Sequence, residues 1–104
     1  MDTKKDNIKN NVNHFINELR KKYRVQAAYI YGSYSRGNAT VWSDIDVAII
    51  SPDFSDDLFE ERVRLMKIAA IIDDRIEPHL FRVEDFESSN PLASEIQKYG
   101  ILIS

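Results

Sequence analysis

Residues 31–37 read Tyr-Gly-Ser-Tyr-Ser-Arg-Gly and residues 42–47 read Trp-Ser-Asp-Ile-Asp-Val, and these two stretches decide the fold. The apolar run at 25–31 has the composition of a strand and leads into Gly32, where a glycine lets the backbone turn sharply and a ligand approach it closely. Ser33 follows at the start of a helical turn, where free N–H groups and a hydroxyl can hold phosphate oxygens. The stretches therefore predict a strand, a tight turn into a short helix, a loop and a second strand.

Two carboxylates lie two residues apart in the second predicted strand, at 44–50. Residues two apart in a strand point to the same face, so Asp44 and Asp46 would repel each other. A hard divalent cation is the usual reason for such a pair. Taken alone, the pair could equally be a strand end whose acids face water, but the turn at Gly32 and Ser33 favours a metal site beside bound phosphates.

The pattern Gly32-Ser33, Arg36-Gly37 and Ser43-Asp44-Ile45-Asp46 resembles the signature of the DNA polymerase β nucleotidyltransferase superfamily. The short chain most resembles the minimal nucleotidyltransferase (MNT) branch, and the resemblance continues through 76–81, 84–86 and 90–100 to cover residues 25–104. It implies an α+β fold of the small polymerase-β palm type. In such a palm a mixed, twisted sheet carries its helices mainly on one face.

The resemblance also implies the roles of individual residues. The catalytic and metal-binding residues would be Asp44, Asp46 and Glu77, and those that bind the nucleotide phosphates would be Gly32, Ser33 and Arg36. The implied cofactor is Mg²⁺ or Mn²⁺, and the implied substrate is ATP or another NTP. MNT proteins are often paired with a HEPN-domain protein, as the antitoxin of a toxin–antitoxin pair, so the resemblance implies a HEPN partner.

Several of these residues keep a second interpretation. Glu77 could be the general base, a metal ligand or an exposed strand acid. Arg36 could stabilise phosphate charge or only tie the turn to an acid. His79 shares a strand face with Glu77 and could be a base, but a lone strand histidine is more often structural. Trp42 could stack on a base or pack in the core.

The remaining sequence predicts alternating helices and strands. Helices are expected at 4–23, 58–72 and 92–99, a third strand at 75–82, and a short strand or partner contact at 101–103. Pro78 places the third strand at a sheet edge or at a break in pairing. The apolar face expected for the helix at 58–72 consists of Leu58, Phe59, Val63, Met66, Ala69, Ala70 and Ile72.

Length and composition predict one domain, residues 1–104. The net charge of -3 and pI of about 5.3 argue against direct nucleic-acid binding. No cysteine is present, which excludes disulfides and thiolate metal sites, and no segment is long and apolar enough for a membrane span or a signal peptide. We therefore expect a cytoplasmic protein.

Three functions from different classes fit the sequence. The leading one is a metal-dependent nucleotidyltransferase that moves a nucleoside monophosphate, AMP from ATP, onto a hydroxyl of a partner protein. The second is a non-catalytic binding module that neutralises a HEPN partner by contact. The third is a small-molecule nucleotidyltransferase of the antibiotic-modifying type, which ranks last because such enzymes usually need extra chain to hold the acceptor.

Overall fold

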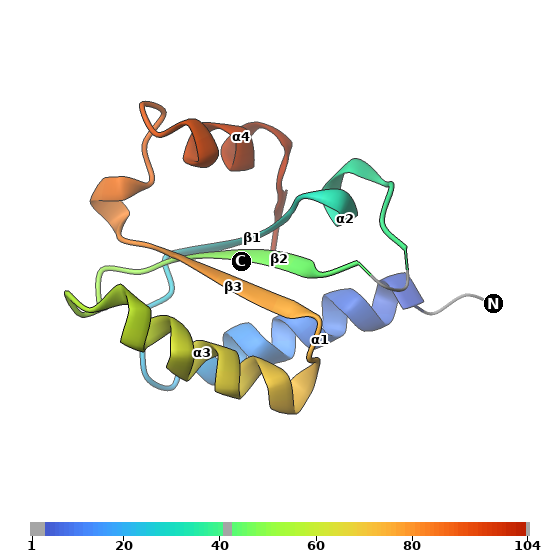
Figure 1. The fold of residues 1–104 in the computed structure, drawn as a ribbon, viewed down its shortest axis with the longest axis horizontal. Helices are drawn as coiled ribbons and strands as arrows, with labels where there is room; N and C mark the ends of the chain where they lie inside the picture. The colour runs from blue at the N-terminus through green and yellow to red at the C-terminus, as the bar shows by residue number, and fades with distance from the viewer. Residues whose placement is uncertain (1–3, 41–42, 104) are drawn as a thin grey trace.

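Four strands form one open sheet in the order β3-β2-β1-β4 (Figure 1). The computed structural model describes residues 4–40 and 43–103, so Trp42 lies outside the described residues. Along the chain the elements are α1 (Lys4–Leu19), β1 (Ala27–Tyr31), α2 (Ser33–Arg36), β2 (Ile45–Ile50), α3 (Leu58–Ile72), β3 (Ile76–Phe81), the 3-10 helix η1 (Val83–Asp85), α4 (Pro91–Tyr99) and β4 (Ile101–Leu102).

The pairing of the strands confirms a mixed sheet. β1 is antiparallel to both β2 and β4, whereas β2 and β3 run parallel. β1 and β2 therefore occupy the centre, and β3, which contains Pro78, is an edge strand, as the proline predicts. Residues 101–102 form the short last strand.

The two long helices, α1 and α3, lie on the same side of the sheet (Figure 1). The side chains of α1 that recur at helical spacing are at most 6% exposed, and they are Ile8, Val12, Phe15, Ile16 and Leu19. The helix ends at Leu19 rather than at residue 23 as predicted, and residues 20–23 continue as a turn. Within 4–40 and 43–103, no helix combines the length and the apolar character that a membrane span requires.

The shorter helix α4 lies on the opposite side of the sheet (Figure 1). Its Ala93 and Ile96 are fully buried in a second, smaller cluster with Ala48, Ile50 and Phe81. Asn90 caps the helix by accepting hydrogen bonds from the backbone N–H groups of residues 92 and 93. The fold is thus the α+β architecture predicted, with its long helices on one face.

Helix α3 turns only part of the predicted face to the core, where Ala69 is buried and Leu58 and Ile72 pack as predicted. Phe59 is 80% exposed and Met66 43% exposed, whereas the fully buried side chains are Glu61, Leu65 and Ala69. The buried Glu61 accepts a 2.8 Å hydrogen bond from the Tyr23 hydroxyl. Burial and this contact raise the pKa of Tyr23 to about 12. The prediction was wrong for Phe59 and Met66 because apolar residues occur on several sides of α3, and a hydrogen-bonded glutamate takes a core position.

We predict that Asp73→Asn weakens the fold at neutral pH but not in strong acid. The Arg75 guanidinium at 2.8 Å and a hydrogen bond from Asn11 lower the pKa of Asp73 from 3.8 to about 2, and its side chain is only 7% exposed. Because the folded pKa lies below the unfolded one, this stabilisation is full above pH 4 and is lost as the pH falls through 2. Its expected size at neutral pH is about 2 kcal/mol.

Denaturant unfolding of the wild type and Asp73→Asn between pH 2 and 7 would measure this difference. The matched control is Asp74→Asn, which changes the exposed neighbouring carboxylate. Parallel stability profiles for the wild type and Asp73→Asn would contradict the prediction.

Candidate active site

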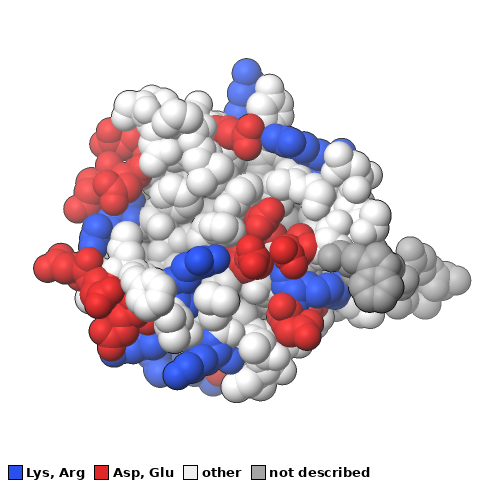
Figure 2. Space-filling model, viewed as in Figure 1, with Lys and Arg blue, Asp and Glu red and all other residues white. Residues whose placement is uncertain are grey.

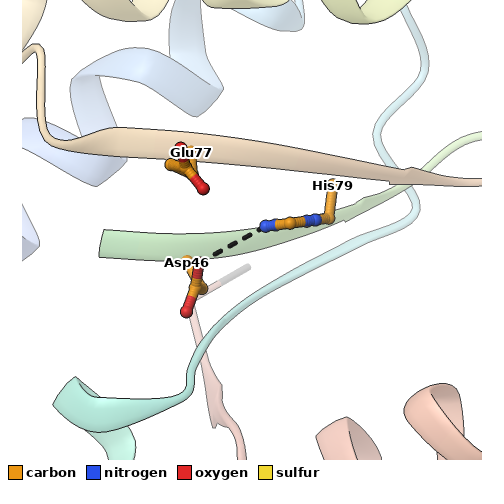
Figure 3. A group of neighbouring side chains, drawn as sticks. All are labelled: Asp46, Glu77 and His79. Carbon is orange, nitrogen blue, oxygen red and sulfur yellow. Dashed lines mark hydrogen bonds and ion pairs between the residues drawn. The ribbon is translucent and has the colours of Figure 1, made fainter. Parts of the chain in front are cut away.

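A carboxylate from each of the two parallel strands meets at one face of the sheet. The register pairs Asp46 of β2 directly with Glu77 of β3, and His79 is two residues further along β3 on the same face. These three half-buried side chains each offer one oxygen or nitrogen atom, and the three atoms lie within 4.8 Å of one another (Figure 3). The His79 Nε2 atom is 3.3 Å from the Asp46 Oδ1 atom, and the two form a hydrogen bond. Oxygen and imidazole donors grouped in this way are the chemistry of a divalent-cation site.

Gly32 makes room for this group. Its φ of 74° and ψ of −143° belong to a region that L-residues with a side chain rarely adopt. A Cβ atom added to it would lie 2.5 Å from the Asp46 Oδ2 atom. The turn thus needs glycine twice, once for its backbone conformation and once because the Asp46 carboxylate packs against its Cα.

Tyr31 borders the site from β1. It pairs with Asp46 across the antiparallel strands, and its ring meets the His79 ring edge-on, with centroids 5.5 Å apart. Burial and the charges of Asp46 and Glu77 raise the pKa of the Tyr31 hydroxyl well above its ordinary value. The tyrosine therefore stays neutral and restricts the position of the imidazole ring.

Asp44 lies apart from this three-residue group. It precedes the first residue of β2 and is exposed. Among the described residues, the cluster with metal-ligand spacing contains Asp46, Glu77 and His79 but not Asp44. A role for Asp44 as a metal ligand remains a prediction from the sequence.

The turn at Gly32 and Ser33, which the sequence predicts to bind phosphate, lies beside the Asp46 carboxylate. Ser33 is the first residue of α2, and Gly32 rather than Ser33 is the N-cap. In the part of the chain that the structure describes, no hydrogen bond is made by the Ser33 hydroxyl. Arg36, in the last turn of α2, forms a 3.2 Å ion pair with Glu95 of α4, and about half of each side chain is exposed. This is an exposed ion pair of the kind that usually contributes little stability, and a phosphate-binding role for Arg36 remains a prediction from the sequence.

His79 is the member of the group to which sequence reasoning gave the least weight. The available signal was the spacing of Glu77 and His79, which puts both on one strand face. The decisive information was the register between β2 and β3, which depends on the sheet and is not visible in either segment alone.

One face of the molecule carries both signs of charge. On the face seen in Figure 2, Asp and Glu side chains gather near the middle, with Lys and Arg side chains beside them. Acidic and basic side chains close together are a combination that suits a substrate with several phosphates and a bound cation.

Comparison with known proteins decides the family. The family model for the nucleotidyltransferase domain matches residues 12–103. The chain belongs to this family. No curated protein sequence matches the chain.

Solved structures agree with this membership of the nucleotidyltransferase domain family. A chain from a toxin–antitoxin complex with AMP-PNP is 26% identical, with a TM-score of 0.65 over 92% of this chain and 72% of that chain. A chain from the complex of a tri-AMPylated Shewanella oneidensis HEPN toxin with its MNT antitoxin is 26% identical, with a TM-score of 0.59 over 90% of this chain and 69% of that chain. A Sulfolobus solfataricus protein, 15% identical with a TM-score of 0.67 over 94% of this chain and 80% of that chain, shares the fold.

These structural neighbours support an MNT-type nucleotidyltransferase domain. The resemblance noted in the sequence is thereby confirmed, and so is the fold that it implies.

Proposed function

We propose that this nucleotidyltransferase domain transfers AMP from ATP to a hydroxyl group of a partner protein, and that the partner is a HEPN-domain toxin. The observation that carries the proposal is the convergence of Asp46 and Glu77 next to the turn at Gly32. Support for the acceptor comes from the tri-AMPylated HEPN toxin, bound to an MNT antitoxin, in one of the similar structures. The cytoplasm supplies ATP and Mg²⁺ together, and we place the reaction there.

The donor set of the site fits a divalent cation. Asp46 and Glu77 would hold it, with Asp44 as a further ligand from the start of β2. A bound Mg²⁺ or Mn²⁺ ion would neutralise phosphate charge and favour ionisation of a nearby hydroxyl.

The other site residues would bind and orient the reactants. The Ser33 hydroxyl would donate to a phosphate oxygen of the outer part of the triphosphate. Arg36 would exchange its exposed partner Glu95 for the same phosphates, at little cost because that ion pair is solvated. The fixed orientation of these groups is a large part of what such a site contributes to the rate.

The bond changes are simple. The acceptor oxygen bonds to the α-phosphorus of ATP, and the bond from that phosphorus to the oxygen bridging to the β-phosphate breaks. Pyrophosphate leaves with that oxygen. The Glu77 carboxylate lies on the open face of β3 with His79, and it would take the proton of the acceptor hydroxyl.

A protein acceptor fits the small size of the domain. The site lies on the sheet near its β3 edge, and the described side chains around it are half-buried rather than enclosed. A reactant as small as water would be poorly oriented there, whereas a folded partner can present its own hydroxyl in a fixed position.

The test is to incubate this protein, ATP and Mg²⁺ with its HEPN partner and to measure the intact masses of both proteins. We expect the partner to gain the mass of one or more AMP groups. The gain should be absent with Glu77→Gln and with the double variant Asp44→Asn, Asp46→Asn.

Two other outcomes would replace the proposal. Silencing of the partner without a mass gain, unchanged in those variants, would indicate the pure binding module. AMP transfer to an added small molecule but not to the partner would indicate the antibiotic-modifying type of enzyme.

A further inference from the structure

We infer that His79 supplies a nitrogen ligand to the metal centre, so that this centre binds later first-row transition ions in preference to Mg²⁺. The inference rests on the metal site of the proposed function and adds both a residue and a metal class to it. It does not depend on the acceptor or on the nucleotide.

The imidazole of His79 is placed to share a cation with the two carboxylates. The His79 Nε2 atom points toward the carboxylates of Asp46 and Glu77, as Figure 3 shows, rather than away from them. Its 3.3 Å separation from the Asp46 Oδ1 atom is close to the spacing of two adjacent ligand atoms on one ion, which is roughly 3 Å for bonds of about 2.0–2.2 Å. The nitrogen and the two carboxylates can therefore share one cation with small side-chain adjustments.

The imidazole of His79 is also held in place by its neighbours. Tyr31 meets the ring edge-on, and the ring is carried by an edge strand whose register is fixed by pairing with β2. A ring held in this way loses little conformational entropy when an ion binds. Among the described residues, no hydrogen-bond partner of His79 other than Asp46 is present.

Ligand chemistry gives the metal preference. A site of carboxylate oxygens alone suits Mg²⁺ and Mn²⁺, whereas an imidazole nitrogen favours ions such as Fe²⁺, Ni²⁺ and Zn²⁺. For a given nitrogen-containing site, affinity rises from Mn²⁺ to Co²⁺ and Ni²⁺ along the first row. Loss of the imidazole should therefore cost Co²⁺ binding more than Mn²⁺ binding, and Mn²⁺ binding more than Mg²⁺ binding.

An alternative role for His79 is to orient Asp46 by donating a hydrogen bond to it. Glutamine can still donate such a bond but offers no imidazole, so His79→Gln separates the two roles. His14, which is exposed on α1, is the only other histidine of the chain and gives a matched control, His14→Gln.

The experiment titrates the wild type and both variants with MgCl₂, MnCl₂ and CoCl₂ in a calorimeter, without nucleotide or partner. We expect His79→Gln to lower Co²⁺ affinity at least about tenfold and to change Mg²⁺ affinity little, while His14→Gln leaves all three affinities unchanged. Equal losses for the three ions, or none, would overturn the inference in favour of an orienting role.

Pulsed electron paramagnetic resonance of bound Mn²⁺ provides a readout that needs no comparison of affinities. We expect the signal of a directly bonded imidazole nitrogen in the wild type and in His14→Gln. Since the chain has two histidines, retention of the signal in His14→Gln assigns it to His79 even if His79→Gln does not fold. Absence of the nitrogen signal in the wild type would refute the inference, whether or not the protein transfers AMP.

Discussion

Asp46→Asn is expected to reduce the rate of AMP transfer by a factor on the order of 10³, because metal-assisted charge stabilisation contributes several kcal/mol to such reactions. Asp46 has a neighbour on each of three sides within the site. It is paired with Glu77 through the strand register, bonded to His79 and packed against Gly32. Asparagine keeps the shape of the side chain but removes its charge, so divalent-cation binding should weaken in parallel.

The fold should survive this substitution. Asp46 and Glu77 are adjacent acids, and removing one charge relieves their repulsion, so the melting temperature should stay the same or rise. Transfer rates measured for Asp46→Asn and for the exposed control Asp74→Asn would isolate the site effect from a general loss of negative charge. A transfer rate within a few-fold of the wild type, in a variant that no longer binds the metal, would remove Asp46 from the mechanism.

Gly32→Ala is expected to lower the transfer rate by about 10²-fold while costing the fold only about 2 kcal/mol. The backbone strain at positive φ accounts for the stability loss. The added methyl group would collide with the Asp46 Oδ2 atom at 2.5 Å. Because that oxygen is at the end of a side chain that can rotate, the collision moves the carboxylate out of the site rather than unfolding the turn.

The variant Gly37→Ala separates the effect of backbone strain from the effect of a collision with Asp46. Gly37 has almost the same φ, 78°, in the left-handed region, but nothing lies within 4 Å of an added Cβ atom. We expect this control to lose about 1 kcal/mol of stability and to keep its transfer rate. Thermal unfolding and initial rates of both variants make the comparison. Equal rate losses at the two glycines would mean that strain in α2, and not displacement of Asp46, controls activity.

Local sequence was sufficient for the features that depend on local chemistry. Gly32 ends the first strand in a turn, the acids open the second strand, and Pro78 restricts the third strand to an edge. Each of these follows from what a residue type permits in its own segment.

Features that depend on contacts between distant segments could not be predicted from local sequence. The inward face of α3 includes Glu61 because Tyr23, from a distant part of the chain, offers it a hydrogen bond. His79 joins the acids because of the register of two strands that are separated by a whole helix. The acid that lies 3.2 Å from Arg36 is Glu95 of α4, which no pattern around Arg36 could name.

The parallel pairing of β2 and β3 makes the site insensitive to the length of the chain that joins them. The ladder sets Asp46 opposite Glu77 residue by residue, whereas the turns before and after α3 serve to return the chain to the strand position beside β2. Length changes in the turns on either side of α3 would leave this pairing in register, whereas α3 itself carries the buried residues Glu61, Leu65 and Ala69. A single residue inserted between Ile76 and Glu77 would instead turn Glu77 and His79 together to the opposite face, toward α3. The chemistry of the site is therefore set by the alignment of two short strands, and not by the length of the turns that join them to α3.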